Sequence, residues 1–137
     1  MGKRKTKEQI SYNMSRVKNK DSEIERMLRH ELWNRGLRYR KNVGGIFGKP
    51  DIVFSGRKVV VFCDSEFWHG YDWDNRKGDI KTNKEFWIEK IERNIRRDIE
   101  VNERLRSDGW IVLRFWGKDI KNDCAGCADK IAEALSL

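Results

Sequence analysis

The stretch Gly48-Lys49-Pro50-Asp51-Ile52-Val53-Phe54-Ser55-Gly56-Arg57-Lys58-Val59-Val60-Val61-Phe62 decides the fold of this chain. It contains two apolar, strand-like runs, 51–54 and 58–62, and Ser55-Gly56 between them is typical of a turn. The second run is apolar on successive residues, which is typical of a central strand covered on both faces. The stretch therefore predicts a β-hairpin inside a sheet that is packed on both sides.

The segments on either side of the hairpin alternate between helical and extended patterns. The further expected elements are a helix from about Ser22 to Arg35, a short strand from Arg38 to Lys41, a polar loop from Gly70 to Lys81, a helix from Thr82 to Arg106, a strand from Trp110 to Phe115 and a helix near Cys124 to Leu135. The long helix has apolar residues at helical spacing, namely Phe86, Ile88, Ile91, Ile95, Ile99 and Leu105. This order predicts an α/β fold, a three-layer sandwich with a mixed central sheet.

The length of 137 residues fits one folded domain, which we expect to span 21–137. Residues 1–20 differ, because they have few apolar residues and a strong positive charge, and we expect a flexible basic arm. The basic residues of this arm are Lys3, Arg4, Lys5, Lys7, Arg16, Lys18 and Lys20. A formal net charge of +8 favours a polyanion as partner, although a merely basic soluble protein would carry it too.

The three cysteines do not resemble a secreted disulfide framework, so a reducing cytoplasm is the expected location. Cys124 and Cys127 lie close together but lack two further zinc ligands nearby, which favours a structural or incidental role. No apolar run approaches the roughly 20 residues of a membrane span, so no membrane contact is expected. The N-terminus is too polar for a secretory signal peptide.

Asp51 stands at the start of one predicted strand, and His69 follows the next strand. Adjacent strands bring such residues together at one edge of a sheet. A carboxylate and an imidazole there can hold a hard divalent cation and move a proton, which phosphodiester hydrolysis needs. Pro50 should bias Lys49 toward extended geometry and present Asp51 rigidly. The alternatives are an Asp that caps a turn and a His packed against Trp68.

Glu25 of the first helix does not belong to its apolar stripe and is a candidate second carboxylate of a Mg²⁺ site. The alternative is a solvated glutamate on the helix surface. Phe67, Trp68 and Trp87 are candidate wedges between DNA bases, and the alternative for each is core filling. An exposed Phe67-Trp68 pair beside a candidate catalytic histidine favours the wedge.

The long helix carries a run of cations that can line a phosphate-binding face together with Asn94 and Asp98. These cations are Lys84, Lys90, Arg93, Arg96 and Arg97. The alternative is a solvated face in which these residues pair with glutamates of the same helix. Both interpretations place the positive charge of this helix at the surface.

The chain from Ser11 to about Phe115 resembles the very-short-patch mismatch repair endonucleases, a branch of the PD-(D/E)xK nucleases with a restriction-endonuclease-like fold. The resemblance rests on several separate blocks in the right order. These blocks are Ser11-Tyr12-Asn13-Met14-Ser15, Asp21-Ser22-Glu23-Ile24-Glu25, Gly48-Lys49-Pro50-Asp51-Ile52-Val53, Phe67-Trp68-His69, Glu85-Phe86-Trp87-Ile88-Glu89-Lys90-Ile91, Asn94-Ile95-Arg96-Arg97-Asp98 and Gly109-Trp110.

The resemblance implies a bacterial enzyme that nicks duplex DNA at a T·G mismatch with Mg²⁺. It implies Asp51 as the central metal ligand, the backbone carbonyl of Cys63 as a second contact and His69 as the histidine that activates water, supported by Glu25. Phe67, Trp68 and Trp87 would intercalate beside the mismatch. We further expect contacts with DNA from Asn13, Met14, Arg16, Lys18, Asn94, Arg97 and Asp98. A monomer near the nucleoid, working with mismatch-repair proteins, is the expected setting.

The chain departs from this family at two places. Members typically have a structural zinc, held by a cysteine before Phe-Trp-His and a His/Cys cluster after it. Glu66 and Gly70-Tyr71-Asp72-Trp73 stand there instead, so we expect no zinc and a loop held by Tyr71 and Trp73. Asp64 replaces a second active-site histidine and can act as an acceptor or a metal ligand. Two alternatives therefore stay open, a related nuclease of other specificity and a DNA-binding module that has lost catalysis.

Overall fold

The computed structural model describes residues 23–41 and 43–136. The expected arm, with Asn13, Met14, Arg16 and Lys18, lies outside the described residues. Within them, four strands form one mixed sheet in the order β1-β2-β3-β4. The strands are β1 (Arg40–Lys41), β2 (Ile52–Phe54), β3 (Val59–Asp64) and β4 (Ile111–Trp116). β2 is antiparallel to β1 and β3, whereas β3 and β4 are parallel.

The predicted hairpin is confirmed as the pair β2 and β3. Val53 faces Val60 across the antiparallel ladder, and a 3-10 turn, η1 (Ser55–Arg57), joins the strands. Every residue of β3 is buried, as the unbroken apolar run predicts for a central strand. β3 is therefore a central strand of the sheet, with β2 on one side and β4 on the other.

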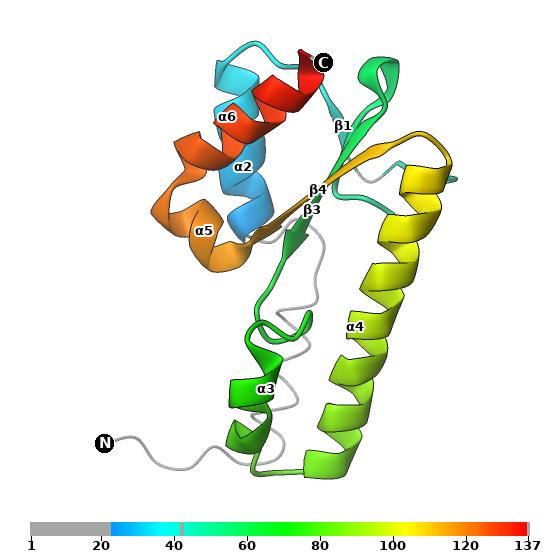
Figure 1. Ribbon diagram of the computed structural model, residues 1–137. Helices are drawn as coiled ribbons and strands as arrows, with labels where there is room; N and C mark the ends of the chain where they lie inside the picture. Colours follow the sequence, from blue (N-terminus) through cyan, green and yellow to red (C-terminus); the bar gives the residue numbers. More distant parts are fainter. Residues whose placement is uncertain (1–22, 42, 137) are drawn as a thin grey trace.

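Helices cover both faces of the sheet (Figure 1). α2 (Glu23–Asn34), α5 (Gly117–Asn122) and α6 (Cys124–Leu135) pack on one face, and α4 (Lys84–Ser107) packs on the other. The core on the first face includes Leu28, Leu32, Val59, Val61 and Ile131. The core on the α4 face is smaller and consists of Val53, Val60, Phe62, Val101, Leu105 and Val112. The predicted three-layer, restriction-endonuclease-like architecture is confirmed.

The parallel pairing of β3 with β4 needs a crossover, and α4 provides it. In this register Asp64, the last residue of β3, lies beside Trp116, the last residue of β4. The carboxyl ends of both strands therefore meet at one edge of the sheet. The segments that leave this edge lead to α5 and to the loop that carries His69.

Three details differ from the expectations. The expected polar loop contains α3 (Trp73–Arg76) and η2 (Lys77–Asp79), and α5 was not anticipated. On α4 the buried residues are Trp87, Ile91, Val101 and Leu105. Phe86 and Ile99, which the apolar pattern assigns to the core, are 58% and 53% exposed. The buried residues share one side of α4, and Phe86 and Ile99 lie about 100–120° away from it around the helix. Figure 1 also shows that α4 extends well beyond the short sheet.

None of the helices in the described part of the chain is both long and apolar enough to cross a membrane.

Candidate active site

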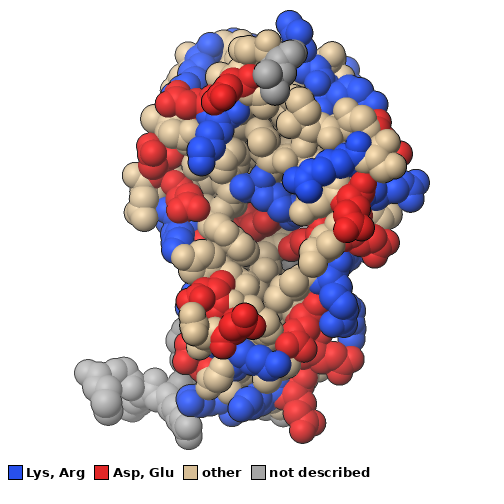
Figure 2. All heavy atoms as spheres, viewed as in Figure 1, with Lys and Arg blue, Asp and Glu red and all other residues tan. Residues whose placement is uncertain are grey.

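A pocket opens at the edge where β3 and β4 end. Its volume is about 1130 Å³, which exceeds the roughly 300–1,000 Å³ of small-ligand pockets and suits a polymer. Glu25, Asp51, Asp64, His69 and Asp98 all line it. Figure 2 shows that Lys and Arg side chains lie beside a recess in which acidic side chains are visible. The fold therefore brings the candidate catalytic residues together in one open site.

The loop before β2 positions Asp51 through close packing on α4. A Cβ at Gly48, whose φ is +83°, would lie 2.4 Å from a methyl carbon of Val101, so only glycine fits there. Lys49 also has a left-handed φ, of 52°. The expectation of an extended Lys49 before Pro50 was therefore wrong, because Lys49 closes a turn in which its N–H donates to the carbonyl of Ile46 at 3.1 Å. Pro50 itself is fully buried and follows this turn directly.

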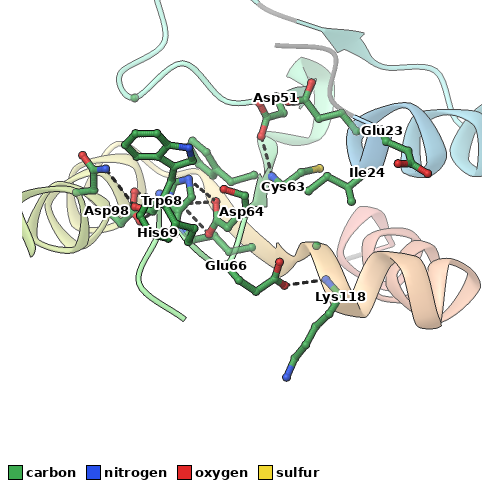
Figure 3. Close-up of a pocket in the computed structure, with 18 of the residues that line it drawn as sticks. Glu23, Ile24, Asp51, Cys63, Asp64, Glu66, Trp68, His69, Asp98 and Lys118 are labelled. Atoms are coloured by element: carbon green, nitrogen blue, oxygen red, sulfur yellow. Dashed lines mark hydrogen bonds and ion pairs between the residues drawn. The ribbon is translucent and has the colours of Figure 1, made fainter. Parts of the chain in front are cut away.

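Asp51 lies against the end of β3 and beside α2. Its Oδ2 accepts a hydrogen bond of 2.7 Å from the backbone N–H of Cys63 (Figure 3). Glu25 is only 5% exposed, which contradicts the alternative of a solvated surface glutamate. Burial, together with the negative charge of Glu25, raises the pKa of Asp51 to about 7. Nη1 of Arg29 pairs with Oε2 of Glu25 at 3.2 Å, yet the pKa of the neighbouring Asp51 stays raised.

His69 is held from the side of α4. Its Nδ1 lies 2.6 Å from Oδ2 of Asp98, and an ionised carboxylate accepts there, so Nδ1 carries the proton. Asn94, one turn earlier, donates a 3.1 Å hydrogen bond to the carbonyl of Trp68. A Cβ at Gly70, whose φ is +69°, would lie 2.4 Å from Ile95, so the loop lies directly on the helix. Asp98 and Asn94 therefore orient the loop 65–72 that carries His69, called the histidine loop below. The sequence did not reveal this role.

In Figure 3, Asp64 lies between Asp51 on one side and the His69–Asp98 pair on the other. Its Oδ1 is 3.6 Å from Nε2 of His69, too long for a hydrogen bond. Nη1 of Arg114, on β4, donates to both Asp64 oxygens, at 3.1 and 3.2 Å. Arg114 was not singled out in the sequence, although an arginine inside an otherwise apolar strand is a visible signal.

The pKa values of Asp64 and His69 follow from burial and from neighbouring charges. Burial raises the pKa of Asp64, and His69 and Arg114 oppose that rise. Burial alone would lower the pKa of His69, but the hydrogen bond with Asp98 and the charge of Asp64 outweigh it, so its pKa is raised. Among the described residues, Asp64, His69 and Asp98 form a cluster with metal-ligand spacing. Oxygen ligands for a hard cation are also available at Asp51 and Glu25.

The three candidate wedges form one aromatic cluster. The rings of Phe67, Trp68 and Trp87 lie 5.5 to 6.1 Å apart in edge-to-face pairs. Trp68 is 6% exposed and Trp87 is 7% exposed, so the expectation of an exposed Phe-Trp pair was wrong for Trp68. Phe86 packs on Trp87 and remains exposed. The aromatic rings shield one another, and their intercalation into DNA stays a prediction.

The residues at the family's zinc positions make other contacts. Glu66 Oε2 accepts a 2.8 Å hydrogen bond from the backbone N–H of Lys118, in the first turn of α5. The ring of Tyr71 packs edge-to-face on Trp116, and its hydroxyl contacts Nζ of Lys118. Trp73 donates a hydrogen bond to Glu92 of α4. These contacts fasten the histidine loop to α4 and α5. Cys124 and Cys127 are free thiols on α6.

The cations of α4 differ in their surroundings. Arg93 forms an exposed ion pair with Glu89, as the alternative of a solvated face predicts. Arg97 lines the pocket, and its guanidinium lies over the ring of Phe47. Arg104, about two turns further along α4, flanks the same ring. Of the expected DNA-contacting cations, Arg97 is thus directed toward the pocket, while the arm residues lie outside the described part of the chain.

Comparison with known proteins gives consistent matches. The family described as DNA mismatch endonuclease Vsr matches residues 3–75. The chain is 54% identical to the Type II nicking enzyme V.NmeDIP of Neisseria meningitidis serogroup C, over 96% of this chain and 89% of that protein. It is 57% identical to the Type II nicking enzyme V.HpaIIP of Haemophilus parainfluenzae, over 75% and 73%. It is 36% identical to the DNA mismatch endonuclease Vsr of Escherichia coli K12, over 77% and 67%.

The fold, the acidic pocket and these similarities define a DNA endonuclease. Within that class, the chain belongs to the DNA mismatch endonuclease Vsr family.

Proposed function

We propose that this endonuclease nicks one strand of duplex DNA at a T·G mismatch and that it requires Mg²⁺. The observation that carries the proposal is the pairing of Asp51 with Glu25 in the same pocket as the His69–Asp98 hydrogen bond. The name of the E. coli relative, a DNA mismatch endonuclease, supports the mismatch as substrate. The domain from residue 21 to 137 would act with residues 1–20 as an arm along the DNA.

The residues around Asp51 fit a hard divalent cation. The charge of Glu25 contributes to the raised pKa of Asp51, and a cation between these carboxylates would relieve their repulsion. Asp51, Glu25 and the Cys63 carbonyl would hold the ion, with Asp64 as a further candidate. When bound, Mg²⁺ supplies Lewis acidity toward a phosphate oxygen. The Cys63 N–H, by donating to Asp51, fixes the orientation of that carboxylate.

His69 would take the proton of the attacking water at Nε2. Asp98 holds the opposite nitrogen, Nδ1, as the N–H form, so Nε2 keeps its lone pair in the neutral imidazole. A raised pKa makes the imidazole a better proton acceptor. Asn94 would act indirectly by holding the carbonyl of Trp68, next to His69.

Contacts with DNA would come from three groups of residues. Phe67, Trp68 and Trp87 would separate bases beside the mismatch, at a cost of about a few kcal/mol per step. Arg97 would bind a backbone phosphate at the pocket. From the arm, Asn13, Met14, Arg16 and Lys18 would contact the duplex. Burial of Trp68 and Trp87 implies that the aromatic cluster must rearrange before it can intercalate.

The test is a strand-nicking assay on an end-labelled duplex with one T·G mismatch. Wild-type protein with Mg²⁺ should produce a single nick, and excess EDTA should stop it. Asp51→Ala should abolish nicking, whereas Asp108→Ala should not, because Asp108 is an exposed residue at the end of α4. Equal rates for wild type and Asp51→Ala would refute the proposed role of Asp51.

The same assay decides the specificity. Several relatives are named Type II nicking enzymes, and Asp64 departs from the family histidine, which favours a second candidate, a nick at other mismatches or sites. All mismatches and a matched duplex, placed in one flanking sequence, should be compared. We expect the fastest nicking at T·G; equal nicking of another mismatch would favour the second candidate.

A further inference from the structure

Arg114 is the charged residue of β4, and it enters the pocket from the strand beside Asp64. Its side chain is 18% exposed and lines the pocket. The residues on either side of it along β4, Leu113 and Phe115, pack with the core on the other face. An arginine in a largely apolar strand loses hydration, so its contacts must compensate for that loss. Its position therefore calls for a function in the pocket.

The guanidinium of Arg114 is fixed on three sides. Nε donates a 2.6 Å hydrogen bond to Oδ1 of Asn102, on α4. Cζ lies 4.0 Å from the ring centre of Phe62, close enough for a cation–π contact. The remaining side presents Nη1 to the carboxylates. A planar group held in this way has little freedom to turn, so the direction of Nη1 is set by the fold.

Nη1 contacts both carboxylates that flank His69. It lies 3.1 and 3.2 Å from the two oxygens of Asp64 and 3.5 Å from Oδ1 of Asp98. The other oxygen of Asp98 lies 2.6 Å from Nδ1 of His69, and Asp64 lies 3.6 Å from Nε2. One cation thus binds two anions that stand on opposite sides of one imidazole.

We propose that Arg114 is a positioning residue of the nuclease. Its guanidinium holds Asp64 and Asp98 on the two sides of His69 and supplies the positive charge of this cluster. In this arrangement Asp64 serves His69. The inference rests on the proposed function and deepens it. It also accounts for the aspartate at position 64, because a buried carboxylate there requires a partner of opposite charge.

Kinetics of nicking provide the first test. Arg114→Met should lower kcat about 10–100-fold, the range for a group that orients a functional imidazole, while KM for DNA changes less than about threefold, as expected for a group that acts on the chemical step. Arg114→Lys keeps the charge but not the planar fork, so it should retain an intermediate kcat. Arg106→Met, an exposed arginine of α4 outside the pocket, is the matched control. A higher KM with unchanged kcat would overturn the proposal in favour of a simple phosphate contact.

A double substitution separates positioning from loss of folding. In Arg114→Met, Asp64 is left as a buried carboxylate without this partner, and Asp64→Asn removes its charge at nearly the same shape. If Arg114 acts through Asp64, the double variant should have about the same kcat as the less active single variant, because interacting residues are not additive. Losses that simply multiply would overturn the proposal. Arg114→Lys serves if Arg114→Met does not fold.

A third test does not depend on activity. In wild-type protein with labelled histidine, the Nδ1–H of His69 should give a strongly downfield proton resonance, because of its short hydrogen bond to Asp98. Arg114→Met should shift or broaden this resonance, and Arg106→Met should leave it unchanged. An unaltered resonance in Arg114→Met would overturn the proposal. Failure of the wild type to nick a T·G duplex would count against the proposed function alone.

Discussion

The two halves of the pocket differ in the charges that surround their carboxylates. On the α2 side, Asp51 and Glu25 stand together, and burial and mutual repulsion raise the pKa of Asp51 to about 7. On the α4 side, the carboxylates Asp64 and Asp98 are matched by Arg114 and His69. In the first half Arg29 pairs with Glu25 at 3.2 Å, yet the pKa of Asp51 stays raised, whereas in the second half Arg114 and His69 contact both carboxylates. The two halves therefore suit two different proposed roles, metal binding on the α2 side and proton transfer on the α4 side.

Within the α4 half, the largest expected effect comes from removing the imidazole of His69. His69→Ala should lower kcat about 10²–10⁴-fold, the usual contribution of a general base. Binding of Mg²⁺, followed by calorimetry, should persist, because the α2 half is untouched. His30→Ala, an exposed histidine of α2, is the matched control. Loss of Mg²⁺ binding in His69→Ala would contradict the division of the pocket into two halves, because His69 would then contribute to binding of the ion.

A smaller loss is expected when the orientation of His69 is disturbed. Asp98→Asn keeps the shape of the side chain but weakens the 2.6 Å contact with Nδ1, so kcat should fall roughly 10–100-fold. The activity of Asp98→Asn should be measured next to that of Asp108→Asn on the same end-labelled duplex. Equal activity of the two variants would show that Asp98 does not orient the base.

The third effect concerns stability and its dependence on pH. The pKa of Asp51 is about 7 in the folded chain and 3.8 ordinarily, so the folded state binds its proton more tightly. Ionisation of Asp51 therefore opposes folding. The stability that protonated Asp51 contributes is present below about pH 3.8 and is lost as the pH rises to about 7. Asp51→Asn should raise Tm at pH 8 by roughly 2–6 °C and should raise it little at pH 4.

Magnesium provides the control for that experiment. The ion should raise Tm of the wild type at pH 8, because it binds the folded state and relieves the same repulsion. It should have much less effect on Asp51→Asn. A lower Tm for Asp51→Asn at pH 8 would show that the α2 half is not strained by its own charges.

The smallest effect is expected at the contact between the histidine loop and α5. Glu66→Ala removes the acceptor for the Lys118 N–H and should cost about 1 kcal/mol of stability, as the loss of a helix cap does. Chemical denaturation measures this, with exposed Glu103→Ala as control. Nicking should fall only slightly, since Asp98 still holds His69. A large loss of kcat would show that α5 also positions the proton-transfer half.

Most of the architecture could be predicted because local patterns determine it. The hairpin follows from two apolar runs around Ser55-Gly56, and α6 from its apolar spacing. α5 was missed because its six residues carry little apolar periodicity and depend on Glu66 from a distant loop. The exposure of Ile99 was missed because Ile88, Ile91, Ile95 and Ile99 also fit a helical stripe, and the sequence does not show which side of α4 faces the sheet.

The candidate site divides in the same way. Asp51 was found because it stands at the start of a strand, next to Pro50, and His69 because it follows a strand and the aromatic pair Phe67-Trp68. Arg114 and the contact of Asp98 with His69 depend on pairs 50 and 29 residues apart, which no local pattern reveals. For Glu25 the helical pattern left burial and exposure open, and only the tertiary structure decides between them.

The parallel pairing of β3 with β4 has a consequence for the synthesis of the chain. Asp51, Asp64 and His69 emerge from the ribosome well before Arg114, which lies on the final strand. Non-local pairing of this kind forms late, because its loop entropy must be overcome first. A truncated chain that stops before β4 would carry the acidic residues and the histidine without the strand that aligns them. The alignment of Asp64 with Arg114 therefore forms only once β4 has paired with β3.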